Sequence, residues 1–284
     1  MKGEKGAEPQ QMVMQPQAYG QPQVMQPVAQ MQMQPGMMVI NTDPWAILSG
    51  MTGAEIKERV RMAEAILGWE QNNIYDIKDQ NGNPAFIAKE DTDTCTRLIG
   101  MCCPVQDCRM FKLDISVPPM PGASPPPFLH LDRPWTCTCY CFNRPKVTVT
   151  DLTAGGEVIG TMRDPWHCCN YNMRMADPEG KDVLNVEASC CQCGFWCPLP
   201  CGPCKEVQFE ITDVESKQKV GHFKRIVPCN LLKFLFTDVD NYQVEFGGIT
   251  DPKWKSLLLA AAVFADFRYF STNKNENSAL GTIS

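Results

Sequence analysis

Residues 257–265 read Leu-Leu-Leu-Ala-Ala-Ala-Val-Phe-Ala, and this stretch is apolar at every position. A helix at the surface of a globular protein carries one apolar stripe, so a helix that is apolar all round must be surrounded by protein or lipid. A bilayer-spanning helix needs about 20 apolar residues, and the segment from Trp254 to Phe270 is shorter and has charges inside both ends. We therefore expect either a helix enclosed by a β-sheet or a helix inserted in a membrane.

The residues before this segment have the pattern of short strands joined by turns. Residues 74–88 are expected to form a hairpin, because Asn81-Gly82 offers the positive φ angles of a tight turn. A second hairpin is expected between Met173 and Glu187. The proline-rich run 118–127 cannot supply ladder donors and is expected to be a loop at a hairpin tip. The pattern predicts a closed antiparallel barrel or a sandwich.

Two other features bear on the fold. Thr150-Asp151 recurs 62 residues later as Thr212-Asp213, and each pair is followed by a segment that contains Val and ends in Gly. This similarity indicates a weak internal duplication. Thr52 and Glu55 have the spacing of a capping box. Because apolar residues then recur with helical spacing as far as Leu67, we expect a short amphipathic helix that ends at Gly68.

Composition separates a tail from one domain. Residues 1–40 are rich in Gln, Met and Pro and repeat a Val-Met-Gln-Pro motif, so we expect a disordered tail that serves as a spacer or contacts protein partners. We expect neither a signal peptide nor a mitochondrial presequence. The domain is expected at residues 44–271, long enough for a single core, and a polar tail at 272–284.

Charge and histidine spacing argue against two classes of function. The chain has 26 basic and 32 acidic residues, a net charge of −6, whereas nucleic-acid binding demands clustered Lys and Arg. His130, His167 and His222 are widely spaced and form no recognisable triad. We therefore expect neither a nucleic-acid binder nor an enzyme with a hydrolytic site.

The sixteen cysteines are bunched beside proline and aromatic residues. Adjacent cysteines in a larger chain suit reduced thiols that are lipidated, metal-bound or redox-active, rather than a disulfide framework. We therefore expect the protein in the cytosol or at the cytoplasmic face of a membrane. Cys137, Cys139 and Cys141 alternate with other residues, so they are candidates for lipidation or, alternatively, small buried side chains of a strand.

A second cysteine cluster has paired thiols. Cys190 and Cys193, with Cys201 and Cys204, form two Cys-x-x-Cys pairs that could supply a tetrahedral zinc site. The interval between the pairs is shorter than the usual zinc-finger spacing, so we do not expect zinc to be the main use of these thiols. Further acylation and free thiols remain open. We expect no thioredoxin-like redox site, since a strand rather than a helix follows Cys204.

Residues 68–77, Gly-Trp-Glu-Gln-Asn-Asn-Ile-Tyr-Asp-Ile, and residues 90–97, Glu-Asp-Thr-Asp-Thr-Cys-Thr-Arg, resemble the opening signature of the phospholipid scramblase family. Arg133-Pro134, residues 236–242 and the terminal apolar segment follow in the family's order, so the resemblance covers about residues 44–271. It implies a closed antiparallel twelve-stranded β-barrel around a hydrophobic C-terminal helix, similar to the tubby C-terminal domain.

The resemblance also implies calcium-responsive, ATP-independent movement of phospholipids between bilayer leaflets. Its further implications are a phospholipid membrane as partner, a location at the cytoplasmic face of the plasma membrane, and palmitoylation in the cluster of Cys137, Cys139 and Cys141. The alternative is a membrane-tethered β-barrel that serves as an interaction or signalling module and transports no lipid itself.

A candidate calcium site lies close to this helix in the sequence. Asp238, Asp240 and Asn241 have the spacing of the first half of an EF-hand loop, and oxygen ligands are those that calcium prefers. The twelfth position, acidic in the family, is Ile249, and Asp251 could substitute for it. We expect weak calcium binding or, alternatively, an acidic turn that caps a strand.

Overall fold

The computed structural model describes residues 43–59, 72–91, 110–119, 124–136, 142–199, 201–227 and 241–270. The chain divides into two units, residues 1–40 and 41–284, and the described residues all lie in the second. The expected N-terminal and C-terminal tails lie outside the described residues.

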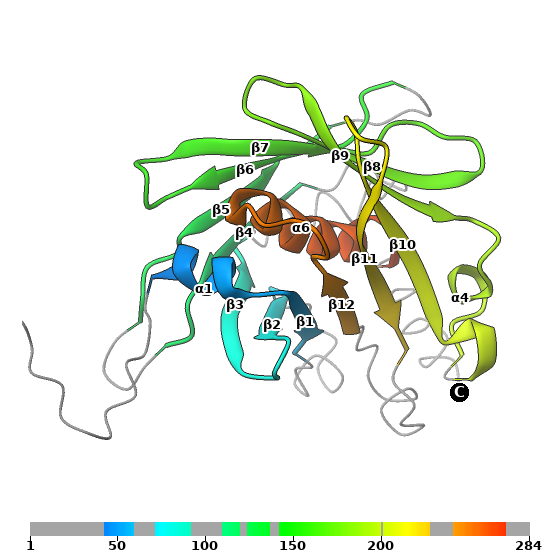
Figure 1. The fold of residues 1–284 in the computed structure, drawn as a ribbon, viewed down its shortest axis with the longest axis horizontal. Helices are drawn as coiled ribbons and strands as arrows, with labels where there is room; N and C mark the ends of the chain where they lie inside the picture. The colour runs from blue at the N-terminus through cyan, green and yellow to red at the C-terminus, as the bar shows by residue number, and fades with distance from the viewer. Residues whose placement is uncertain are drawn as a thin grey trace, which may run out of the picture. The chain divides into compact units, whose positions relative to one another are not determined.

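The second unit is a closed antiparallel β-barrel, in which each strand pairs with its neighbours in sequence and β1 pairs with β12 (Figure 1). This arrangement confirms the barrel and excludes the sandwich. The strands are β1 Gly53–Glu58, β2 Ile74–Asp79, β3 Pro84–Glu90, β4 Phe111–Ser116, β5 Leu129–Arg133, β6 Lys146–Asp151, β7 Glu157–Arg163, β8 Asn170–Ala176, β9 Asp182–Ser189, β10 Glu206–Asp213, β11 Lys219–Ile226 and β12 Asn241–Glu245.

The C-terminal helix α6 (Pro252–Ala265) lies inside this barrel, and the π-helical turn η3 (Asp266–Phe270) continues it (Figure 1). Every residue of α6 from Lys255 to Ala265 is buried, which confirms the enclosed helix. Alternating strand residues point inward and pack against it, as the period of two requires. Within the described residues, no helix has both the length and the apolar character needed to span a bilayer.

Short helices flank the strands. Helix α1 (Pro44–Gly50) precedes β1, while α4 (Cys193–Trp196) and the 3-10 turn η2 (Gly202–Cys204) lie between β9 and β10. The α1 N-terminus is capped by Asp43, whose carboxylate accepts a hydrogen bond from the Trp45 backbone N–H at 3.0 Å.

The expected hairpins are present. β2 and β3 are joined by a turn in which Gly82 has a φ of 83°, and β8 and β9 by a turn in which Gly180 has a φ of 87°. Both glycines adopt the left-handed conformation that residues with a Cβ disfavour. The proline-rich loop connects the paired strands β4 and β5.

The internal duplication corresponds to a shared local structure. The β6–β7 register shifts between Val149 and Thr150, and the β10–β11 register shifts between Ile211 and Thr212. Each shift is followed by an aspartate whose carboxylate accepts a hydrogen bond from a turn backbone N–H: Asp151 from Thr153 at 2.8 Å, and Asp213 from Ser216 at 2.6 Å. A bulge and a turn held by an aspartate side chain therefore occur at the same place in both hairpins.

The expected helix from Thr52 is wrong over residues 53–58, which form β1. This segment pairs with β2 on one side and β12 on the other, so the barrel cannot close without it. Ala54 and Ile56 are buried with the period of a strand. Gly53 allows β12 to approach, because a Cβ there would lie 2.9 Å from the Val244 carbonyl oxygen. Leu67 and Gly68 lie outside the described residues.

Polar contacts fix both ends of the enclosed helix. The Lys255 ammonium donates to the carbonyls of Leu48, Ser49 and Met51 at 3.3, 2.9 and 2.7 Å, and so caps the C-terminal end of α1. Burial lowers the pKa of Lys255 below its ordinary value. At the other end, the buried Asp266 carboxylate accepts hydrogen bonds from the Tyr75 hydroxyl at 2.6 Å and the Tyr242 hydroxyl at 2.9 Å.

We predict that Ala261→Gln destabilises the barrel. Ala261 is fully buried on α6, so the larger side chain overpacks the interior and leaves an amide without partners. These effects should lower the free energy of unfolding by about 2–5 kcal/mol. The melting temperature, followed by circular dichroism, should fall by about 5–10 °C. Lys253→Gln, at an exposed position of the same helix, is the control. An unchanged melting temperature for Ala261→Gln would show that α6 is not enclosed.

Candidate functional site

The described cysteines gather at one end of the barrel. Because neighbouring strands are antiparallel and sequential, the β5–β6, β7–β8 and β9–β10 connections all lie at the same end. Cys168 and Cys169 lie in the β7–β8 connection, and residues 190–204 of the β9–β10 connection carry the other described cysteines. We call this the cysteine end.

The thiols at the cysteine end are free and accessible. Cys190 and Cys204 are half-buried, and the exposed cysteines are Cys168, Cys169, Cys191, Cys193, Cys197 and Cys201. A hydrogen bond with Cys168 raises the pKa of Cys169. Burial, reinforced by the neighbouring thiols, raises the pKa of Cys190 and Cys204. These three thiols are therefore protonated at neutral pH, which makes them weaker nucleophiles than thiolates.

The four candidate zinc ligands do not form one group. The thiols that raise the pKa of Cys204 are Cys197, Cys193 and Cys201, whereas those that raise the pKa of Cys190 are Cys191 and Cys168. Across the ranges that the structure describes, no three or more His, Cys, Asp or Glu side chains are arranged to hold a metal ion.

The candidate lipidation residues Cys137, Cys139 and Cys141 lie outside the described residues. Their described neighbours Thr136 and Phe142 belong to the β5–β6 connection and so lie at the cysteine end. The Phe142 side chain is 70% exposed.

The two described candidate calcium ligands, Asn241 and Asp251, belong to separate elements. Asp238 and Asp240 lie outside the described residues, and Asn241 begins β12 at the cysteine end. Asp251 follows the far end of β12 and caps α6, accepting a hydrogen bond from the Lys253 backbone N–H at 2.8 Å. The strand alone separates them by about 13 Å. The structure therefore does not bring Asn241 and Asp251 together. Ile249, which lies between them in the sequence, is buried.

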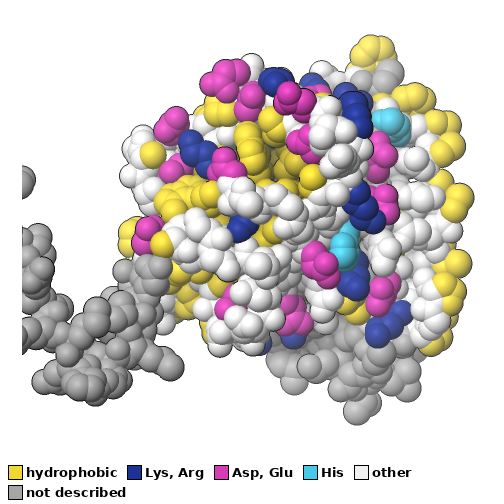
Figure 2. Space-filling model, in the orientation of Figure 1, with side chains coloured by type: hydrophobic (Ala, Val, Ile, Leu, Met, Phe, Trp, Pro, Cys, Tyr) yellow, Lys and Arg dark blue, Asp and Glu magenta, His cyan; other side chains and the backbone are white. Residues whose placement is uncertain are grey.

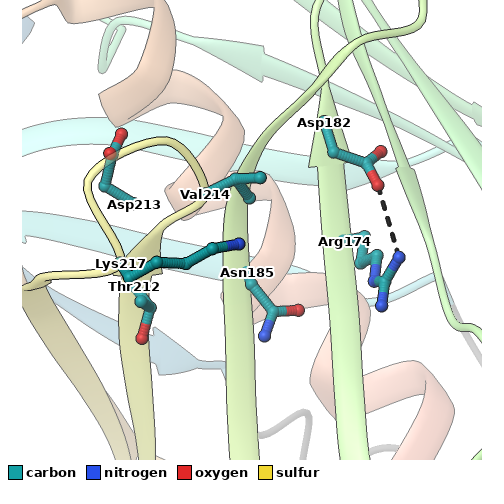
Figure 3. A pocket seen from close by; sticks show the side chains of 7 residues that line it. All are labelled: Arg174, Asp182, Asn185, Thr212, Asp213, Val214 and Lys217. Carbon is teal, nitrogen blue, oxygen red and sulfur yellow. Dashed lines mark hydrogen bonds and ion pairs between the residues drawn. The ribbon is translucent and has the colours of Figure 1, made fainter.

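A shallow pocket, lined mostly by residues with polar or charged side chains, lies between β8, β9 and the β10–β11 turn (Figure 3), and no sequence motif indicated it. It is lined by Arg174, Asp182, Asn185, Thr212, Asp213, Val214 and Lys217. Its acidic groups are already engaged, because Asp182 pairs with Arg163 at 2.6 Å and Asp213 accepts from Ser216. Asn185 Oδ1 is buried without a protein partner, which suits a bound water.

Charged side chains of both signs are interspersed over the face shown in Figure 2. Hydrophobic side chains lie along the edge on the side where Figure 1 places α4, and a second hydrophobic patch lies on the upper left of the same face.

Comparison with known proteins places the chain in a family. The Scramblase family model matches residues 33–272, which include every strand of the barrel and α6. Phospholipid scramblase 2 of Bos taurus is 30% identical over 221 residues, which are 78% of this chain and 69% of that protein. Phospholipid scramblase 1 of Homo sapiens is 28% identical over 226 residues, 80% of this chain and 65% of that protein.

Phospholipid scramblase 1 of Mus musculus is 27% identical over 226 residues, 80% of this chain and 63% of that protein. The matches therefore span roughly two thirds of these relatives' own length. No solved structure matches the chain. The match to the family model covers well over half of the chain and coincides with the barrel, and the chain therefore belongs to the scramblase family.

Proposed function

We propose that this protein moves phospholipids between bilayer leaflets without ATP and in response to calcium. The observation that supports the proposal is the family match across the whole barrel, with relatives named phospholipid scramblases. Such an activity makes and breaks no covalent bond, so it requires no nucleophile or general base. The protein would act at the cytoplasmic face of the plasma membrane, and the Gln-, Met- and Pro-rich residues 1–40 suit contacts with protein partners.

The enclosed helix favours a second candidate function. Residues 257–265 of α6 are fully buried, so the helix presents no polar path along which head groups could cross a bilayer. A barrel that is tethered to the membrane as an interaction or signalling module would need no such path. The two candidates differ in one measurable property, the movement of lipid.

We predict lipid movement by the full chain reconstituted in phosphatidylcholine and phosphatidylserine vesicles. With a fluorescent lipid in both leaflets and a membrane-impermeant quencher outside, protein-free vesicles should lose about half of the signal. Vesicles with protein should lose more when calcium is added in the absence of ATP. Ala261→Gln, which disrupts the barrel, should abolish the extra loss, and Lys253→Gln should retain it. Equal quenching with and without protein at every calcium concentration would favour the tethered module.

We propose that acyl chains on Cys137, Cys139 and Cys141 anchor the protein. Each buried methylene contributes about 0.8 kcal/mol, so two chains suffice for stable attachment. Replacing all three by Ser should move the protein from the membrane to the soluble fraction of cells. Cys168→Ser with Cys169→Ser, at an exposed pair in another connection, should leave the distribution unchanged. Retention of the wild type on membranes after hydroxylamine treatment would show that thioesters are not the anchor.

We propose Asp238, Asp240 and Asn241 as ligands of a weak calcium site, with a dissociation constant of about 0.1–1 mM or weaker because carboxylates are few. Calorimetry should show that Asp238→Ala removes binding. Asp251→Asn should retain it, because Asp251 is engaged in capping α6 and Asn preserves that cap. Loss of binding in both variants would make Asp251 a ligand, and retention in both would place the ligands elsewhere.

A further inference from the structure

Large apolar side chains are exposed mainly at the cysteine end. Among the described residues there, they are Leu199 and four aromatic residues, Trp135, Phe142, Trp166 and Trp196, and we call these four the aromatic rim. They lie in the β5–β6, β7–β8 and β9–β10 connections, which follow one another around the barrel. The other exposed large apolar residues, Leu152 and Val158, lie at the opposite end in the β6–β7 hairpin. Several exposed aromatic residues at one end of a barrel indicate a surface that meets another apolar phase or molecule.

Trp196 is held outward by its surroundings. Its side chain is 75% exposed, yet the indole N–H donates to the Cys190 carbonyl at 2.7 Å. The one polar group of the side chain is therefore satisfied by the protein, and the ring itself is left to an external apolar partner.

The segment that carries Trp196 is fixed to the barrel. The neighbouring Phe195 turns inward and stacks on Tyr171, with ring centroids 4.1 Å apart. The Gln192 amide bridges to β10, donating to the Gln208 carbonyl at 2.8 Å and accepting from the Gln208 backbone N–H at 2.7 Å. α4 therefore presents the Phe195 ring to the core and the Trp196 ring to the exterior. Because the segment is already held in place, burying the Trp196 ring against a partner costs little conformational entropy.

Charge at the rim selects an anionic partner. In the described parts of the three connections, the only carboxylate is Asp164, which is 3% exposed and accepts from Arg144 at 2.5 Å and Arg268 at 2.6 Å. The connections add Lys205, and the adjoining strand ends add Lys146 of β6 and Glu206 of β10, which lies 4.0 Å from Lys224. The described parts of these three connections therefore carry more basic than acidic side chains, in a chain whose net charge is −6.

We propose that the aromatic rim docks on the surface of a bilayer that contains anionic phospholipid, with Trp135, Trp166 and Trp196 at the level of the head groups. Tryptophan is enriched at this interface, where its apolar ring can be buried, and basic side chains beside it add electrostatic attraction. The inference rests on the proposed membrane function and deepens it, because it specifies which surface meets the lipid. It requires no acyl chain, so the rim should bind lipid before any thiol is modified.

The test uses the full chain purified without acylation under reducing conditions, together with large vesicles of phosphatidylcholine alone or with phosphatidylserine. The wild type should sediment with the anionic vesicles, and brominated lipids should quench its tryptophan fluorescence. The triple variant Trp135→Ala, Trp166→Ala and Trp196→Ala should bind about tenfold more weakly or worse. Leu152→Ala with Val158→Ala, at the opposite end, is the matched control and should bind like the wild type.

Lys146→Glu with Lys205→Glu tests the charge. This variant should lose affinity for anionic vesicles and become less sensitive to salt. Circular dichroism should show that all variants keep the wild-type melting temperature, because the changed side chains lie at the surface. Equal vesicle binding by the tryptophan variant and the wild type would overturn the inference, as would equal loss in the Leu152 and Val158 control.

Vesicle binding and lipid movement are read separately. Rim-dependent binding without lipid movement would leave the docking surface standing and overturn the proposed scrambling. Lipid movement that is equal in the wild type and the tryptophan variant would overturn the docking surface and leave the scrambling in place. If the wild-type protein binds vesicles of neither composition, the inference is overturned and the rim is assigned to a protein partner.

Discussion

A helix with no polar face has to be surrounded on all sides, and α6 is surrounded by a sheet that closes on itself. In a smaller barrel the side chains of the strands can fill the interior, but a twelve-stranded barrel is wider. The helix fills the space that the strand side chains leave. Close approach is possible because Gly160 of β7 has no side chain; a Cβ there would lie 3.0 Å from Leu257. The small residues Ala260, Ala261 and Ala262 similarly keep the helix narrow.

Apolar packing is non-directional, so the position of the helix along the barrel axis gains a further restraint from polar contacts. The directional contacts at its two ends supply that restraint. Lys255 has three carbonyl acceptors around the end of α1, and Asp266 has two tyrosine donors from β2 and β12. A shift of either charge would leave it buried without these partners, at a cost of several kcal/mol.

Much of this architecture can be predicted from the sequence, because turn glycines, alternation and an all-apolar segment are local signals. The hairpins at Gly82 and Gly180 and the enclosed helix are examples. β1 was predicted as a helix because Thr52 and Glu55 imitate a capping box, and only pairing with two distant strands reveals otherwise. The sequence indicated a strand after Asn241, and the structure shows that this strand, β12, separates Asn241 from Asp251. Exposure of Trp196 depends on what packs around it, which local patterns do not encode.

The aromatic rim and the enclosed helix are joined by direct contact. Phe195 of α4 stacks on Phe270 at the end of η3, with ring centroids 5.6 Å apart, and Phe270 in turn lies under the Arg225 guanidinium at 4.2 Å. A displacement of α4 would therefore act first on the last turn of the buried helix, since close-packed interiors do not deform freely. Asp266, whose contacts help to hold the helix along the barrel axis, begins that same turn.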